Sequence, residues 1–294
     1  MSTITSSTPS TPTTNAAFSL YEQRAAGSLP LFIVEGLAFL AILRRDLVVA
    51  KREFIGNLIQ AMVVPGFFLF IFGRVLPQTG VASPGYAALL LPGMVAMSLL
   101  MTGLTNVTLS LVLDIGNERE IEDRLLAPLP VAFVAIERVL FASLYSLVAS
   151  ALVFPLAYLI LGSAFQMRTD AIGLLVGLII LSAFAGAALG LAIGTAVKPE
   201  QIGLLNALII LPLIFTGCIY FSWSALSSIR WFQVVTLFNP LTYSAEGLRG
   251  VMTPGFHGQM LAALNIQWVL LGLVGTIVVF LGLGVRGFLR RAIQ

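Results

Sequence analysis

Long runs of uncharged, apolar residues constrain this chain more than any other feature of its sequence. A helix needs roughly 20 residues to cross the hydrocarbon core of a bilayer. Six runs are long enough to serve as spans: 57–73, 87–113, 139–161, 171–197, 203–220 and 264–285. The mean hydropathy of +1.00 over 294 residues also exceeds what a soluble globular core requires. We therefore expect an all-α, polytopic membrane protein with six transmembrane helices.

Lysine and arginine residues are distributed unevenly between the two sides of these runs. Six spans place both ends of the chain on the same side of the membrane. If that side is the cytoplasm, twelve of the 16 basic residues lie inside, and only Arg74, Arg168, Arg230 and Arg249 lie outside. This distribution obeys the positive-inside rule. We expect a multi-pass protein of the bacterial cytoplasmic membrane with cytoplasmic N- and C-termini.

The chain before the first span divides into two parts. Residues 1–17 are rich in Ser, Thr and Pro and carry no charge, which predicts a disordered cytoplasmic tail. Within residues 18–56, apolar residues recur every three or four positions, and the basic residues occupy a different arc of the same helix: Arg44, Arg45, Lys51 and Arg52. This pattern predicts an amphipathic interfacial helix in contact with membrane lipids. The alternative is a simple basic flank before the first span.

A short charged segment separates the second and third apolar runs. It is a predicted amphipathic helix that ends at Pro128 and Pro130. Its charged residues are Asp114, Glu118, Arg119, Glu120, Glu122, Asp123 and Arg124. Unpaired charges are costly in hydrocarbon, so this segment must lie in water or against a protein partner. We expect it to be the place where another protein acts on this chain.

The segment from Phe221 to Thr253 is too long for a turn and too apolar for a solvated loop. It breaks at Asn239 and Pro240, because the residue before a proline disfavours helical geometry. A second helical run follows, in which Glu246 and Arg249 are spaced to pair on one face. We expect a re-entrant helical hairpin in the outer leaflet. The alternative is a pair of interfacial helices held by tryptophans.

The sequence lacks the residues needed for nucleotide hydrolysis, for metal binding and for nucleic-acid binding. Neither lysine has the flanking residues of a nucleotide-binding P-loop, so any ATP hydrolysis must occur in another polypeptide. The single histidine, His257, has no neighbouring carboxylates, and Cys218 has no second cysteine, so we predict neither a metal site nor catalytic residues. The net charge of +3 is dispersed, which disfavours nucleic acid as a partner.

Two motifs resemble those of one transporter family. The run from Glu118 to Pro130, EREIEDRLLAPLP, resembles the segment after the second span in permeases of the ABC type 2 exporter family. The run Asn239, Pro240, Leu241, Thr242 and Tyr243, followed by Glu246 and Arg249, is similar to the signature before that family's last span. The resemblance covers roughly residues 36–290. It implies that residues 57–290 form a six-span ABC type 2 transmembrane domain.

The resemblance also implies partners and a direction of transport. Glu118, Arg119, Glu120, Glu122, Asp123, Arg124 and Pro128 would belong to a coupling helix that contacts a separate ATP-binding subunit, expected in two copies, which binds ATP and Mg²⁺. A second permease subunit, identical or related, would complete the substrate path. The outer hairpin would include Asn239, Pro240, Tyr243, Glu246 and Arg249. Export is the implied direction. An ion-coupled secondary carrier is the main alternative, and an integral membrane enzyme is a further one.

Other features concern the interior of the spans. Prolines inside the apolar runs should kink or locally open helices: Pro65, Pro92, Pro155 and Pro212. Gly186, Gly190 and Gly194 form successive small-xxx-small steps, which suit close helix packing within one subunit or between two. Some apolar residues could line an adaptable substrate path, and the alternative is that they face lipid or the core: Phe67, Phe68, Phe70, Phe72, Met94, Met97 and Met101.

Overall fold

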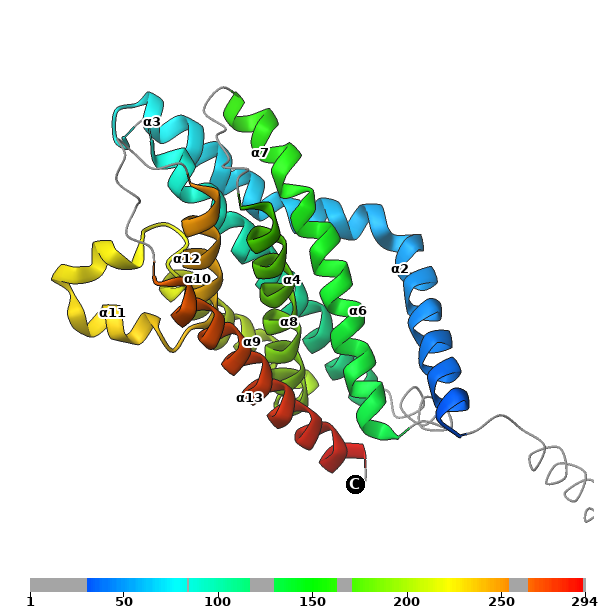
Figure 1. The fold of residues 1–294 in the computed structure, drawn as a ribbon. Helices are drawn as coiled ribbons and strands as arrows, with labels where there is room; N and C mark the ends of the chain where they lie inside the picture. The colour runs from blue at the N-terminus through cyan, green and yellow to red at the C-terminus, as the bar shows by residue number, and fades with distance from the viewer. Residues whose placement is uncertain (1–30, 84, 117–129, 163–170, 254–263, 293–294) are drawn as a thin grey trace, which may run out of the picture.

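The computed structural model describes residues 31–83, 85–116, 130–162, 171–253 and 264–292, and within this part of the chain all regular structure is helical (Figure 1). The longer helices are α2 (Leu31–Phe70), α4 (Tyr86–Gly116), α6 (Val131–Ala151), α8 (Ile172–Ala196) and α13 (Ile266–Ala292). The shorter α-helices are α3 (Leu76–Gln78), α7 (Val153–Leu161), α9 (Ile202–Leu205), α10 (Leu211–Thr216), α11 (Arg230–Thr236) and α12 (Pro240–Met252). Two π-helical segments, η1 (Ile71–Val75) and η4 (Asn206–Ile210), and two 3₁₀ segments, η3 (Pro199–Gln201) and η5 (Trp223–Ser228), complete the list.

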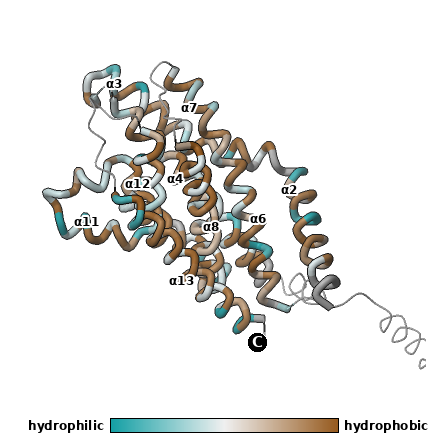
Figure 2. The backbone as a smooth tube through the Cα atoms, viewed as in Figure 1, coloured by the Kyte–Doolittle hydropathy of each residue, from teal (hydrophilic) through white to brown (hydrophobic). Residues whose placement is uncertain are grey.

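Six helical segments of the described chain are long and apolar enough to cross a membrane, which confirms the number of spans expected from the sequence. They are Leu58–Gln78, Tyr86–Leu113, Ala132–Leu161, Ile172–Ala196, Pro199–Thr216 and Ile266–Arg291. Hydrophobic positions run along these helices, and hydrophilic positions occur in the first part of α2, on α6 and at the end of α13 (Figure 2). The predicted interfacial helix and the first span form one helix, α2, whose direction changes along its length (Figure 1).

The third span begins earlier than the sequence predicted. We placed its start at residue 139 because Glu137 and Arg138 interrupt the apolar run. The helix instead begins at Val131, and the two charged residues lie inside it with only 1% and 6% of their surface exposed. Arg138, which we expected in the aqueous segment before the span, is therefore buried. Hydropathy alone could not show this, because it scores a buried, partnered charge and a solvated one alike.

Helix α4 occupies the centre of the bundle and packs against α8, α6 and α12. Small residues allow its close contact with α8. A Cβ atom on Gly186 would lie 2.5 Å from the carbonyl oxygen of Leu100, and one on Gly190 would lie 2.5 Å from that of Leu104. Only glycine permits this approach of two backbones. The glycine steps predicted from the sequence therefore pack helices within one subunit.

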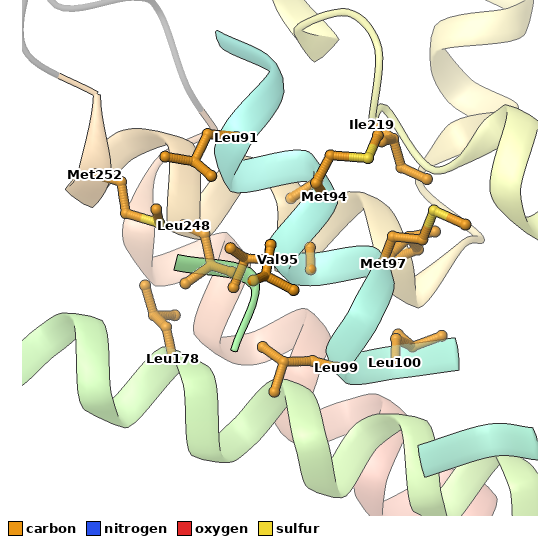
Figure 3. Close-up of a cluster of buried hydrophobic side chains, with 14 of the residues drawn as sticks. Leu91, Met94, Val95, Met97, Leu99, Leu100, Leu178, Ile219, Leu248 and Met252 are labelled. Atoms are coloured by element: carbon orange, nitrogen blue, oxygen red, sulfur yellow. The ribbon is translucent and has the colours of Figure 1, made fainter. Parts of the chain in front are cut away.

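The main core surrounds the N-terminal half of α4 (Figure 3). Met94 and Met97 are buried in it, and Met101 packs against it partly buried, so these side chains contribute to the core. Figure 3 shows Met94 beside Ile219, and Leu248 and Met252 of α12 on the side of Leu91 and Val95. A second core lies near the other end of the bundle, where Phe288 of α13 packs with residues of α4, α6 and α8.

Breaks in regular α-helix lie near prolines in three of the spans. Two of the four prolines predicted to open helices, Pro155 and Pro212, lie beside such breaks, whereas Pro65 and Pro92 lie inside the continuous helices α2 and α4. The π-helical segment η1 directly precedes the helix that contains Pro77, and η4 precedes Pro212. The third span divides into α6 and α7 at Leu152, shortly before Pro155. Proline has no backbone N–H, so the carbonyl group four residues earlier lacks its helical hydrogen bond. A π turn beside the proline accommodates this unpaired carbonyl group. These three spans are therefore locally irregular.

The α4–α8 contact can be tested by adding one methyl group to α8. Gly190→Ala should lower the free energy of unfolding by about 1–3 kcal/mol, because the new Cβ overlaps the backbone of α4. The matched control is Gly177→Ala on the same helix, where a Cβ meets nothing within 4 Å. It should be neutral or stabilise by up to about 1 kcal/mol, since alanine favours helix. Thermal unfolding of the purified protein in detergent measures both, and equal stability of the two variants would contradict the packing.

Candidate functional site

The polar residues that we predicted for the outer hairpin meet around α12. Asn239 caps this helix: its Oδ1 accepts a 2.9 Å hydrogen bond from the backbone N–H of Leu241, and Pro240 occupies the first helical position. Both residues are typical of a helix start. The Asn239 amide also donates to the carbonyl oxygen of Leu213 at 2.7 Å and to Thr216 Oγ1 at 2.9 Å, both in α10. The cap therefore joins α12 to the fifth span.

Glu246 and Arg249 form an ion pair on α12, as their spacing predicted, and both side chains are fully buried. The Glu246 carboxylate also accepts a 2.9 Å hydrogen bond from the backbone N–H of Trp223. This carboxylate consequently receives donors from its own helix and from the start of η5.

The Arg249 guanidinium extends beyond Glu246 to two other segments of the chain. Its Nη2 donates to the carbonyl oxygens of Cys218 at 2.8 Å and Ile219 at 3.3 Å, in the turn after α10. Its Nε donates to the carbonyl oxygen of Leu89 in α4 at 3.3 Å. A guanidinium has five donors in a rigid plane, so it can bind several carbonyl groups at once where lysine could not. Arg249 thereby joins the second span, the end of the fifth span and α12.

Tyr243, the remaining residue predicted for the hairpin, faces the last span. Its hydroxyl donates to the carbonyl oxygen of Leu237 at 2.8 Å, at the end of α11. Its ring lies against Gly272 of α13, where a Cβ atom would come within 2.6 Å of it. Tyr243 therefore holds the junction of α11 and α12 close to α13.

The η5 and α11 segments project sideways from the bundle (Figure 1). Two reciprocal hydrogen bonds join them: Trp223 Nε1 donates to the carbonyl oxygen of Gln233, and Gln233 Nε2 donates to that of Trp223, each at 3.1 Å. The apolar side chains of α11 and its flanks face outward, with Trp231 71% and Phe238 85% exposed. A rigid projection with an exposed apolar surface suits contact with lipid or with another protein.

The other two predicted groups are only partly within the described residues. Arg44, Arg45 and Lys51 lie exposed on α2, and the side chain of Arg52 falls outside what the structure describes. The interfacial position of this helix stays a prediction. The tail 1–17 and the coupling residues Glu118, Arg119, Glu120, Glu122, Asp123, Arg124 and Pro128 also lie outside the described residues.

The structure reveals one charged group that the sequence analysis missed. Glu137 and Arg138 are buried on α6, where Asp46 of α2 attracts Arg138 and Arg45 of the same helix repels it. A buried charge needs an opposite charge such as that of Asp46 to offset its desolvation. The signal in the sequence was the pair of charges at the edge of an apolar run, which we interpreted only as the end of a span.

The residues that the structure describes contain no cluster of three or more histidine, cysteine or acidic side chains with the geometry of a metal site. What α12 builds is a set of hydrogen bonds between helices, not a set of groups arranged around a reacting atom.

The known protein families decide which kind of membrane protein this is. The family model described as ABC-2 type transporter matches residues 37–253, which is more than half of the chain. The chain belongs to the ABC-2 type transporter family. No curated protein matches it significantly.

As an ABC-2 family member, this protein is a multi-pass transport permease and not itself an ATPase. The family implies partnership with an ABC ATP-binding subunit. The matched residues include both the charged segment between α4 and α6 and the whole of α12, so the two motifs lie within the family's own domain.

The buried ion pair can be tested by removing its cation. Arg249→Leu should lower the free energy of unfolding by about 3–5 kcal/mol, because Glu246 is left buried without its cation. Exchanging both residues, Glu246→Arg with Arg249→Glu, should not restore stability, since a carboxylate at position 249 would face the carbonyl oxygens of Leu89, Cys218 and Ile219.

The matched control for Arg249→Leu is Arg230→Leu, which removes an exposed arginine from the neighbouring α11. It should change the stability by about 0.5 kcal/mol or less. Thermal unfolding in detergent measures all of these variants. Similar stability of the Arg249→Leu and Arg230→Leu variants would show that the buried network contributes little.

Cys218 provides a chemical test of the same site. The side chain is fully buried between the turn after α10 and α12, so a reagent in solution has no access to the thiol of the folded protein. A maleimide should therefore fail to label the folded protein at pH 8 and should label it fully after denaturation in SDS. Rapid labelling of the folded protein would contradict the closed packing around Arg249.

Proposed function

We propose that this ABC-2 permease is the membrane half of an ATP-driven exporter, coupled to a separate ATP-binding subunit through the charged segment between α4 and α6. The observation that carries the proposal is the concentration of charge in that segment, Asp114 to Arg124, in a chain with only 29 Asp, Glu, Lys and Arg residues. A charged surface between two spans suits a protein partner, because complementary charges direct association.

The position of this segment supports the proposal. It connects the end of α4 to the start of α6, and α6 starts at the end of the bundle where α13 finishes (Figure 1). With the basic residues in excess on this side, it is the cytoplasmic side, where ATP is available. The proposed location is the bacterial cytoplasmic membrane with both termini in the cytoplasm.

The proposed assembly contains two ATP-binding subunits, which bind ATP and Mg²⁺, and two permease subunits that enclose the substrate path. The second permease is a copy of this chain or a related one. Three spans bury little of their most apolar stretch within the chain: 22% in Leu58–Gln78, 6% in Pro199–Thr216 and 17% in Ile266–Arg291. These faces are available to lipid and to the second permease.

ATP binding would draw the two ATP-binding subunits together and move the coupling segments, which shifts the spans from one access state to the other. The η5–α11–α12 hairpin would close the outer end of the path. In this proposal the exposed apolar side chains of α11 lie in the outer leaflet, and Arg44, Arg45, Lys51 and Arg52 of α2 meet lipid head groups on the inner side.

A secondary carrier would need an ionisable group free to exchange protons or sodium ions near the middle of the membrane. Among the described residues, Glu137 and Glu246 are buried carboxylates that such a mechanism could use. The Oε1 atom of Glu246 is engaged by both Arg249 and the backbone of Trp223, which favours a fixed structural charge at that position. A membrane enzyme would need acid–base groups that converge on one point, and the α12 cluster lacks that form.

Charge reversals in the coupling segment test the proposed function. Glu118→Arg or Arg124→Glu should weaken association with the ATP-binding subunit or separate ATP hydrolysis from transport, because a reversed charge in an interface can cost several kcal/mol. Thermal stability of the permease alone should hardly change. Co-purification, ATPase activity and ATP-driven transport in vesicles measure the three effects.

The matched control for these reversals is Arg290→Glu, which reverses an exposed charge in the last turn of α13 on the same side of the membrane. It should retain association, hydrolysis and transport. If Glu118→Arg and Arg124→Glu behave like this control in all three measurements, the segment is a solvated connection and the proposed coupling is wrong.

A further inference from the structure

The fifth span is held firmly at its outer end and loosely below it. We propose that Arg249 and Asn239 are positioning residues that keep the outer end of the fifth span fixed to the second span, while the part below Pro212 bends at η4 during transport. This inference rests on the proposed function, because it assumes that the protein transports a substrate. The contacts of α4, α10 and α12 support it. We call residues 86–93 of α4, α10, the turn 217–222 and α12 the outer block.

The turn 217–222 is bound to the outer block through its own backbone. Arg249 binds the carbonyl oxygens of Cys218 and Ile219, and the Tyr86 hydroxyl donates to that of Tyr220 at 2.8 Å. Cys218 has a positive φ of 52°, a backbone conformation that is unfavourable for residues other than glycine. Three successive carbonyl groups are thus bonded, and the backbone tolerates strain to present them.

Helix α10 is bound to α12 by the residues at the start of α12. The Asn239 amide donates to Leu213 and to Thr216, and the Thr242 hydroxyl lies 3.3 Å from the carbonyl oxygen of Thr216. A Cβ atom on Gly217 would lie 2.5 Å from the side chain of Leu241. The last turn of the fifth span therefore has little freedom to move relative to α12.

Helix α4 joins the outer block where Pro92 interrupts its hydrogen bonding. Pro92 has no N–H to donate to the carbonyl oxygen of Ala88, and the Thr253 hydroxyl lies 3.4 Å from that oxygen. At the next residue, Gly93, an added Cβ would overlap the backbone of Ile219. Figure 3 shows the side chains of Met94 and Ile219 next to each other at this contact.

The part of the fifth span below Pro212 differs from α10 in its hydrogen bonds rather than in its burial. Only 6% of the whole span is buried within the chain, with Leu204 and Leu208 58% and 70% exposed and Leu205 the buried residue of α9. What distinguishes α10 is the set of hydrogen bonds that it receives from α12. The π-helical segment η4 lies directly before Pro212, which cannot donate to the carbonyl oxygen of Leu208. A π turn beside a proline is a common place for a helix to bend.

The hydrogen bonds of the outer block and the π-helical segment beside Pro212 together determine where the fifth span can move. Separating the outer block would leave a buried guanidinium and several backbone carbonyl groups without partners, which is costly in an apolar interior. Bending at η4 breaks none of these bonds. A force applied from the cytoplasmic side should therefore move α9 and η4 and leave α10 with α4 and α12.

Distances between spin labels test this division. One pair, at Phe215 and Gly250, lies within the outer block, and the other pair, at Leu204 and Gly250, crosses η4; all three positions are exposed. The labels are placed in a Cys218→Ala background, which keeps the carbonyl group that Arg249 binds. Distances are measured in the complex with its ATP-binding subunit in nanodiscs, without nucleotide and with ATP bound to a hydrolysis-deficient partner.

We expect the pair across η4 to shift on ATP binding and the pair within the outer block to stay unchanged. Pro212→Ala, which restores a helical donor, should reduce the shift, and Arg249→Gln should broaden the distance distribution within the block. An equal shift of both pairs would overturn the inference, as would unchanged distances in a complex that transports with ATP.

The same experiment separates this inference from the proposed function. If the complex shows no ATP-driven transport, the proposed function fails. The distributions without nucleotide still decide about the bend: a broad distribution across η4 beside a narrow one within the block supports it, and equal widths exclude it.

Discussion

The packing around α12 depends on the need of a buried arginine for hydrogen-bond acceptors. Arg249 is almost fully enclosed, and its guanidinium is satisfied by Glu246 and by backbone carbonyl groups of α4 and of the turn after α10. An unpaired guanidinium in an apolar interior would be very costly, so these segments must meet at one place. The fold of α12 beside α4, and the course of the chain between the fifth and sixth spans, follow from that requirement.

In the centre of the bundle, direct packing of two helix backbones holds the structure together. Gly186 and Gly190 bring α8 against α4 so closely that no side chain fits between them. Lipid is as apolar as leucine, so close packing and interhelical hydrogen bonds, rather than burial of apolar area, hold membrane helices together. The result is a well-packed centre of α4, α8 and α12, with α2, the fifth span and α13 exposing apolar faces at the periphery.

Charged residues occupy both buried and exposed positions along the chain. Glu246 and Arg249 are buried and hold helices together, whereas Arg44, Arg45 and Lys51 are exposed on α2. Glu137 and Arg138 are also buried, on α6 shortly after the charged segment. In the proposed function, the ATP-binding subunit acts on the charged segment that precedes these buried charges, and the outer block keeps its shape.

The sequence by itself determined the six spans, the helix start at Asn239 and Pro240, and the pairing of Glu246 with Arg249, because hydropathy, proline geometry and i,i+3 spacing are local properties. Tertiary structure alone decided what else Arg249 binds. Its acceptors at Leu89 and Cys218 are 160 and 31 positions away, and a backbone carbonyl leaves no mark in the sequence. The burial of Glu137 and Arg138 was hidden for a related reason: whether a charge is solvated or enclosed depends on helices that approach it from elsewhere in the chain.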